Sequence, residues 1–203
     1  RDRSPSRGLG DVYKRQTEGE SSGLWSVLRS SEDEVLKGSL LITLYENLRW
    51  KTISPQGFRE EMLAYLPNES NSLLFSMALS YLGDCQRIFP SDSRPLEQVL
   101  WKIVTTNPVS QHRLQAFRLY RSIADSEEAV QRLYTLWQER KAPKDCTLSE
   151  SDYIGLSYML AMHLPEKADK IIATQLSRIQ NPDRKKEYQF ISPSVSPRKA
   201  ERD

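Results

Sequence analysis

Two histidines, two cysteines and a few carboxylates are the side chains most capable of chemistry in this sequence. His112 and His163 lie 51 positions apart, so they cannot form H-E-x-x-H, in which two histidines one helical turn apart bind zinc. His112 falls in the first turn of a predicted helix and is expected at a polar surface or corner. His163 falls near a helix end, where a partly charged imidazole is favourable. Neither histidine is predicted to bind a metal.

The cysteines and carboxylates do not form a recognisable catalytic set either. Cys85 and Cys146 are 61 positions apart without a C-x-x-C partner, which is typical of unpaired packing residues, although a disulfide between them stays open. Glu46, Glu150 and Asp152 could supply acid–base chemistry, but spacing selects no pair among 27 Asp and Glu residues. Glu150 and Asp152 are more simply charges at a helix N-terminus. No nucleophile elbow surrounds a serine or cysteine. No catalytic, cofactor-binding or metal-binding residue is therefore predicted.

Residues 1–16 differ in composition from the rest of the chain. They contain five basic residues, two acidic residues and no apolar period, and they resemble a peptide translated from sequencing adapter DNA. We therefore expect a disordered, non-native tail here, with a flexible tail of the protein itself and an Arg/Ser-rich RNA-binding arm as alternatives. Without this tail the chain has 24 basic and 25 acidic residues. A near-neutral body lacks the clustered positive charge typical of nucleic-acid recognition, so no nucleic-acid partner is predicted.

Apolar residues in the remaining chain recur with a helical period, and no segment alternates as a strand does. Helices of about 10–18 residues joined by short corners predict an all-α fold. Pairs of such helices occupy about 35–45 residues, which favours a curved stack of antiparallel helix pairs, a HEAT/armadillo-like α-superhelix. A compact helical bundle is the structural alternative. No apolar run reaches the ~20 residues of a membrane span.

Serine, asparagine and proline mark most of the predicted helix starts. In the first full helix, Leu36, Leu40, Leu44 and Leu48 are spaced by four and are expected to face inward. In the last, Tyr188, Phe190 and Ile191 are expected to supply the apolar contacts. The predicted starts are a Ser31/Glu34 capping box, Ser54-Pro55, Ser110, Ser126, a Ser149/Asp152 capping box, and Asn181-Pro182.

One corner carries a family resemblance. Thr174–Ser196 contains the motif RIxNPDR, then a basic pair and an aromatic-x-Phe-Ile-x-Pro segment. This order resembles the end of the C-terminal helical domain of M1-family zinc aminopeptidases, in a bacterial branch. The resemblance continues upstream in Ser39–Trp50, Phe117–Trp137 and Leu148–Ala161, and so covers the chain from about Leu24 onward. These signatures are architectural and carry no catalytic residue, because both H-E-x-x-H and the family's G-x-M-E-N motif are absent.

The resemblance implies that this chain is a non-catalytic part of a metallopeptidase that removes N-terminal residues from peptides. Zinc would belong to the parent enzyme, and the partners would be the catalytic domain of the same polypeptide and a peptide substrate. Helical domains of this family close over the catalytic cleft, where basic groups can face the far end of the peptide. The cluster Arg184-Lys185-Lys186 is more simply a solvated helix face, and through the resemblance Arg184 is the one candidate substrate contact. The resemblance leaves the bacterial compartment open between periplasm or cell envelope and cytoplasm.

These observations predict a linker at residues 17–23 and one helical domain at residues 24–203 that is truncated at both ends. The alternative function is a free-standing helical-repeat scaffold that binds another protein. Composition and helical period fit both functions equally well, and the motifs that resemble the aminopeptidase family favour the aminopeptidase fragment.

Overall fold

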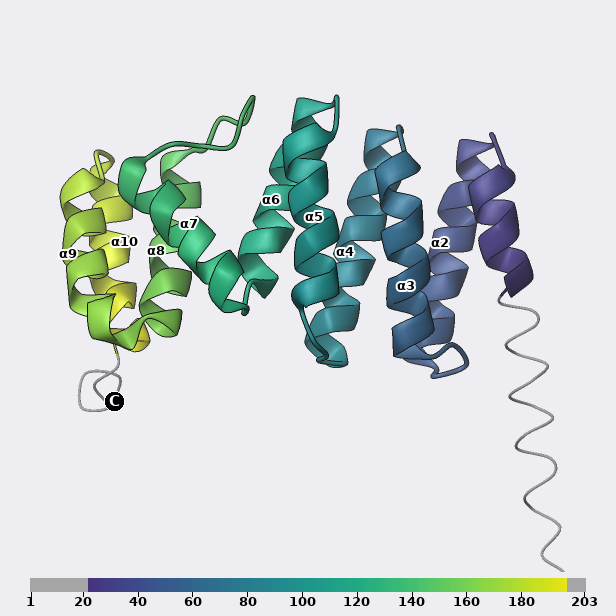
Figure 1. Cartoon of the computed structure of the whole chain (residues 1–203), viewed down its shortest axis with the longest axis horizontal. Coiled ribbons are helices and arrows are strands. Elements are labelled where there is room, and N and C mark those ends of the chain that lie inside the picture. The colour runs from purple at the N-terminus through teal and green to yellow at the C-terminus, as the bar shows by residue number, and fades with distance from the viewer. Residues whose placement is uncertain (1–21, 197–203) are drawn as a thin grey trace, which may run out of the picture. The chain divides into compact units, whose positions relative to one another are not determined.

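The computed structural model describes residues 22–196, and every regular element within that range is a helix. The prediction of an all-α chain is therefore confirmed for the described residues. The chain divides between Ser91 and Asp92 into two compact units, called here the first and the second unit (Figure 1). None of the helices in residues 22–196 has both the length and the apolar character needed to cross a bilayer.

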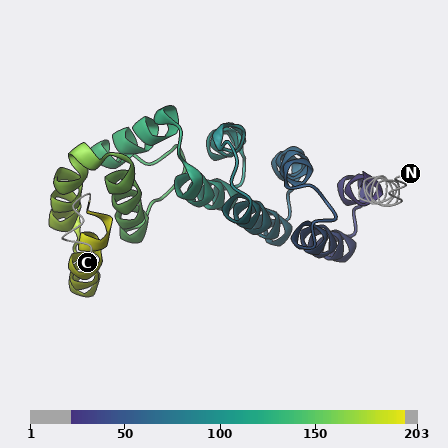
Figure 2. The same ribbon diagram turned by 90° about the horizontal axis from the view of Figure 1, so that it is seen from below.

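The helices of the first unit lie in two rows (Figure 2). Its first described helix covers residues 22–30 and begins inside the predicted linker. Trp25 of this helix packs edge-on against Phe58, with ring centroids 5.7 Å apart, and Tyr45 stacks on Tyr81 at 4.2 Å. Each contact joins a helix to the next but one. The further elements of the unit are α2 (Glu34–Arg49), α3 (Pro55–Tyr65), the 3-10 turn η1 (Leu66–Asn68) and α4 (Ser72–Ile88).

Helices α2 and α4 run parallel, because residues near their starts pair with each other and residues further along do the same. Lys37 Nζ lies 2.6 Å from Glu69 Oε2, just before α4, and the Tyr45 hydroxyl donates to Asp84 Oδ2 at 3.0 Å. Glu69 Oε1 also accepts from the backbone N–H of Asn71, the N-cap residue of α4, at 2.7 Å. The buried Glu69 carboxylate thus ties the start of α2 to the start of α4.

Two predictions for α2 are wrong in detail. Asp33, not Ser31, is the N-cap, because its carboxylate reaches the backbone N–H groups of the first turn directly. Leu36 is 41% exposed, whereas the later leucines of its row are buried. A spacing of four exceeds the helical repeat of 3.6, so the row rotates by about 40° at each step and Leu36 falls outside the buried stripe.

The second unit consists of helical hairpins. Helices α5 and α6 pack along each other and are joined by only three residues, so they are antiparallel (Figure 1). Helices α8 and α9 form a similar hairpin around Pro165. The elements are α5 (Arg94–Thr106), α6 (Ser110–Ile123), α7 (Glu127–Glu139), α8 (Glu150–His163), η2 (Pro165–Lys167), α9 (Ala168–Arg178), α10 (Pro182–Ile191) and η3 (Ser192–Val195).

Alternate helices of the second unit are also held side by side. The Trp137 indole N–H of α7 donates to Gln175 Oε1 of α9 at 2.8 Å. Arg118 Nε of α6 donates to Asp152 Oδ1 of α8 at 3.0 Å. Both acceptors are buried, so each hydrogen bond also satisfies a polar group that is removed from water.

Glu97 joins α5 to the start of α7 and is only 4% exposed. Its Oε1 accepts from the Ser93 hydroxyl at 2.8 Å and from the backbone N–H groups of Asp125 and Ser126 at 2.8 and 3.1 Å. Its Oε2 accepts from the Ser126 hydroxyl. Burial alone would raise the pKa of Glu97, but these hydrogen bonds stabilise the carboxylate and bring its pKa below the ordinary value.

The predicted N-caps of the second unit are mostly confirmed. Ser126, Ser149 and Asn181 each accept a backbone N–H of the following first turn, and Ser149 forms the predicted capping box with Asp152. Ser110 is instead the first residue of α6, after Val109 as N-cap.

Candidate functional site

The candidate site lies between α8 and α10 and contains Arg184, the residue predicted to contact a substrate. Asn181 starts α10 by accepting the backbone N–H groups of Asp183 and Arg184 at 3.0 and 3.1 Å. Pro182 suits the next position, because its ring fixes a helical φ and its missing N–H would have no partner there. This local chemistry places Arg184 in the first turn of α10.

Glu150, the first residue of α8, holds the start of α10 in place. Its Oε2 accepts from the backbone N–H of Gln180 at 2.7 Å, and its Oε1 accepts from Arg184 Nη1 at 3.3 Å. The hydrogen bond from Gln180 is the largest cause of the lowered pKa of Glu150. Glu150 is thus a helix N-terminal charge, as predicted, and it also orients Arg184.

Two tyrosines form the middle of the site. Tyr188 of α10 is buried and stacks on Tyr158 of α8 with ring centroids 4.9 Å apart. Its hydroxyl lies 2.9 Å from Ser157 Oγ, which donates to the Ile154 carbonyl. Burial raises the pKa of Tyr188, so its hydroxyl ionises even less readily than an ordinary phenol. Phe190, predicted to supply apolar contacts, is instead 87% exposed, because only the face of α10 that carries Tyr188 meets α8.

The pocket beside these tyrosines has a volume of about 180 Å³. Ile154, Tyr158 and Ile191 give it apolar walls, and Arg184 and Glu187 give it one charge of each sign. The Arg184 side chain is 44% exposed, and its pair with Glu150 occupies one of the two terminal nitrogens. A guanidinium has five N–H donors, so Arg184 can bind a further carboxylate while the walls contact an apolar group. Glu187 would repel a second negative charge.

Comparison with known proteins found no match. Neither protein-family models nor curated proteins match the sequence, and no solved structure matches the fold. The functional interpretation therefore rests on the geometry of the α8–α10 site and on the sequence resemblance.

The two histidines lie apart from this site. His112 is fully buried in α6, contrary to the predicted surface position. It precedes Ala116 and Tyr120 at intervals of four, so it belongs to the buried stripe of that helix. His163 lies in the last turn of α8, as predicted, with its Nδ1 4.0 Å from Asp125 Oδ1. Within residues 22–196, no three or more His, Cys, Asp or Glu residues gather in a way that could hold a metal ion.

Both cysteines are free thiols. Arg59 Nη1 lies 3.6 Å from Cys85 Sγ, a basic neighbour that the sequence does not reveal. Burial nevertheless outweighs Arg59 and raises the pKa of the Cys85 thiol, and burial likewise raises the pKa of Cys146. A raised pKa disfavours the thiolate, which is the nucleophilic form. The structure therefore gives neither cysteine the environment of an activated nucleophile.

Sequence reasoning missed the residues that position α8. Asp152 is a capping-box residue as predicted, but it also pairs with Arg118 of α6. Arg121 Nη1 donates to the Asp152 backbone carbonyl at 3.0 Å and packs on Gly155, where a Cβ atom would lie 2.7 Å from it. These partners are 31 and 34 residues apart in the chain, so no local pattern connects them. A lone glycine inside an apolar helix was the one available signal.

Proposed function

We propose that this chain is the non-catalytic helical domain of an M1-type zinc aminopeptidase, and that it encloses the chamber in which peptides lose their N-terminal residues. The observation that carries the proposal is the RIxNPDR resemblance in Thr174–Ser196, together with its upstream continuations. Zinc would be held by the catalytic domain of the longer polypeptide, and no residue of this chain is proposed to bind it. The helical domain would exclude water and orient the peptide.

We also infer that the helix pairs form a curved, HEAT/armadillo-like stack. This inference is supported by the side-by-side contacts of alternate helices inside each unit, such as Tyr45 with Tyr81 and Trp137 with Gln175. Each helix of a solenoid contacts mainly its neighbours in sequence and the equivalent helix of the next repeat.

Arg184 is our candidate for contact with the far end of the peptide. Its guanidinium is oriented by Glu150 and half-exposed at the mouth of a pocket with apolar walls. A peptide with one terminal carboxylate and an apolar last residue matches these groups. The proposed substrate class is therefore short peptides.

A long-read sequence across both ends of the gene tests the assignment. The expected result is a frame that continues upstream into H-E-x-x-H and a downstream glutamate. The purified product of that frame should hydrolyse aminoacyl anilides and lose this activity with a chelator. A start codon immediately before Arg1, with no such frame upstream, would overturn the proposal.

The role of Arg184 needs a separate test in the full-length enzyme. We expect Arg184→Ala to slow hydrolysis of peptides while leaving hydrolysis of amino-acid anilides unchanged, because anilides have no distal carboxylate. Lys185→Ala is the matched control, since Lys185 is an exposed cation one position further along α10. Equal losses on both substrates in Arg184→Ala would remove the proposed contact.

A free-standing scaffold for another protein is the second candidate. It is favoured by large exposed apolar side chains in the first unit, namely Val35 of α2, Trp50 directly after α2, and Leu73 of α4, which are 80%, 78% and 69% exposed. Exposed apolar groups of this size can mark protein-binding surfaces. The gene sequence distinguishes the two candidates, because only the aminopeptidase requires the upstream zinc motif.

A further inference from the structure

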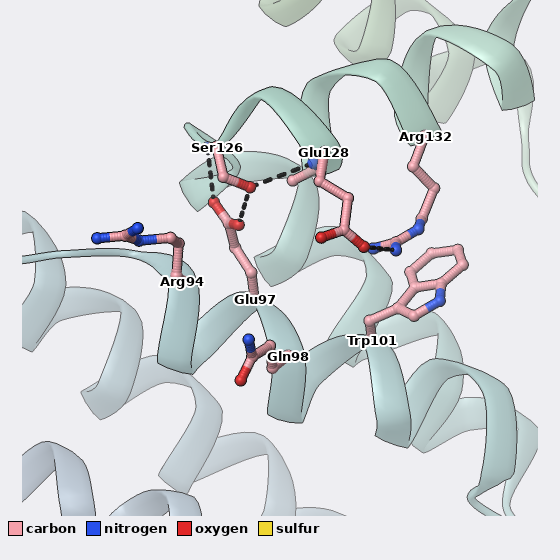
Figure 3. Close-up of a pocket in the computed structure, with 8 residues that line it drawn as sticks. Arg94, Glu97, Gln98, Trp101, Ser126, Glu128 and Arg132 are labelled. Carbon is pink, nitrogen blue, oxygen red and sulfur yellow. Dashed lines mark hydrogen bonds and ion pairs between the residues drawn. The ribbon is translucent and has the colours of Figure 1, made fainter.

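A larger pocket of the second unit lies between α5 and α7 and has a volume of about 300 Å³. Arg94, Gln98 and Trp101 of α5 line it, together with Glu128 and Arg132 of α7 (Figure 3). The two arginines lie at opposite sides of the pocket in this view, with the Glu97 side chain between them and Gln98 below. The proposed function assigns no role to this pocket.

Arg132 presents a guanidinium that is already fixed. Its plane lies over the Trp101 ring, with the central carbon 4.7 Å from the ring centroid, and its Nη1 donates to the Tyr120 hydroxyl at 2.9 Å. The arginine side chain is 30% exposed. A guanidinium held in this way loses little conformational entropy when it binds a carboxylate, so its orientation favours an anionic ligand.

Glu128 occupies the other terminal nitrogen of Arg132, and its own position is weakly determined. Its Oε1 lies 2.5 Å from Arg132 Nη2, but the glutamate side chain is 80% exposed. Exposed ion pairs one helical turn apart contribute little to stability. The carboxylate of Glu128 can therefore leave at low cost, whereas the aromatic ring and the tyrosine hydroxyl keep the arginine in place.

The rest of the pocket suits a peptide chain. Gln98 is exposed, and its carboxamide has N–H donors and a carbonyl acceptor. It can therefore form hydrogen bonds with the C=O and the N–H of a peptide bond. Glu97 also lines the pocket, but its oxygens already accept from Ser93, Asp125 and Ser126, so its negative charge is offset by fixed donors. Arg94, which is held by Asp92, places a second cation at the far side.

We propose that this pocket binds a carboxylate of an acidic peptide, with Arg132 as the partner and Glu128 in the place of that carboxylate when no peptide is bound. An acidic side chain and a free chain end both supply a carboxylate. Release of Glu128 from Arg132 accompanies binding, so Glu128 acts as an internal competitor. The proposal does not depend on the aminopeptidase assignment.

Fluorescence anisotropy of the full chain with three rhodamine-labelled pentapeptides tests the ligand class. The first has a central Glu and an amidated end, the second a central Gln and a free carboxyl end, and the third a central Gln and an amidated end. We expect tighter binding of the first or the second than of the third, and the stronger of the two identifies the source of the carboxylate. Equal binding of all three would overturn the proposal.

Substitutions test the roles of Arg132 and Glu128. We expect Glu128→Gln to tighten binding of the carboxylate peptide by about threefold, because it removes the competitor. Glu127→Gln is the matched control, since Glu127 is an exposed carboxylate in the same helical turn, and it should leave the affinity unchanged. Arg132→Gln should weaken binding by about tenfold or more.

An equal change of affinity in Glu128→Gln and Glu127→Gln would overturn the proposal, because the effect would then come from the net charge of the helix and not from competition for Arg132. Unchanged affinity in a folded Arg132→Gln variant would overturn it as well. Circular dichroism establishes folding for each variant. If Arg132→Gln does not fold, the affinities of Glu128→Gln and Glu127→Gln still test the proposal, because both glutamates are exposed and their substitution should leave the fold intact.

Discussion

The α5–α7 and α8–α10 pockets of the second unit both contain a glutamate that accepts backbone N–H groups, but the two glutamates differ in burial. In each, a glutamate of the first helix accepts backbone N–H groups at the start of the next helix but one: Glu97 at Asp125 and Ser126, and Glu150 at Gln180. Glu97 is almost fully buried, whereas the Glu150 side chain is 19% exposed and shared with an arginine. Burial therefore distinguishes two otherwise similar junctions.

The difference shows that the same arrangement, a glutamate that accepts backbone N–H groups at a helix start, can stabilise the fold in one place and orient a ligand-binding residue in another. Glu97 has all its acceptor capacity directed at fixed donors, so it holds the junction and is not available to a ligand. Glu150 keeps the start of α10 in place and also orients Arg184 toward solvent. We expect the first junction to dominate the stability of the unit and the second to be more tolerant of change.

Substitution of the two glutamates gives the largest expected contrast. Glu97→Gln replaces a buried acceptor of four hydrogen bonds by a group with one oxygen, and we expect a loss of about 3 kcal/mol in unfolding free energy. Glu150→Gln removes a partly exposed charge and should cost less than about 1 kcal/mol. Urea unfolding followed by circular dichroism measures both. Equal losses would contradict the proposed division between the junctions.

Removal of the helix caps should show the same contrast on a smaller scale. Ser126→Ala removes the cap of α7 and a hydrogen bond to Glu97, so we expect a loss of about 2 kcal/mol. Asn181→Ala removes only the cap of α10 and should cost about 1 kcal/mol. The urea midpoints of the two variants provide the comparison, and a larger loss in Asn181→Ala would reverse it.

Gly155→Ala disturbs α8 without touching the α5–α7 pocket. The added Cβ forces the Arg121 guanidinium away from the Asp152 carbonyl, and the lost hydrogen bond outweighs the gain in helix propensity of about 1 kcal/mol, so we expect a net loss of about 0.5 kcal/mol. Ala161→Gly is a useful reference, because it changes the same helix in the opposite sense at a buried position. A melting temperature that rises in Gly155→Ala would show that Arg121 moves without cost, because only the gain in helix propensity would then remain.

The smallest effect concerns pH. The folded-state pKa of Glu97 lies below its ordinary value, so its contribution to stability is present above the unfolded-state pKa of about 4.3 and is lost as pH falls through the folded-state pKa. The stability difference between the unchanged protein and Glu97→Gln should therefore narrow below about pH 4. Urea unfolding at pH 7 and pH 3 measures it, and a constant difference would exclude this carboxylate as the titrating group.

The positions of the helices could be predicted because their signals are local. Ser54, Ser126 and Asn181 cap helices through backbone groups two or three residues away, and apolar spacing then carries each helix forward. Local signals also compete: Asp33 replaced Ser31 as N-cap, and Val109 preceded α6 where Ser110 was expected.

The sites were less predictable, because their members are brought together only by packing. Trp101 and Arg132 belong to different helices, and Glu97 and Ser126 are 29 residues apart. No period in the sequence distinguishes Glu97 from an exposed glutamate such as Glu128. Arg184 was identified through a resemblance and not from its surroundings, and its contact with Glu150 emerged from the structure.

Hydrogen bonds between alternate helices of the second unit join residues that are close in sequence, and this affects how the unit unfolds locally. Its hydrogen bonds between alternate helices join residues only 28 to 41 positions apart, so little loop-closure entropy is lost as each helix docks. Folding of such a unit can propagate from one helix to the next. Helix α10 packs on α9 and the following η3 turn and contacts α8 through Tyr188, so it can detach while α5, α6 and α7 keep their packing. Amide hydrogens of α10 should therefore exchange with solvent before those of α6, and the pocket around Arg184 would open and close independently of the pocket around Arg132.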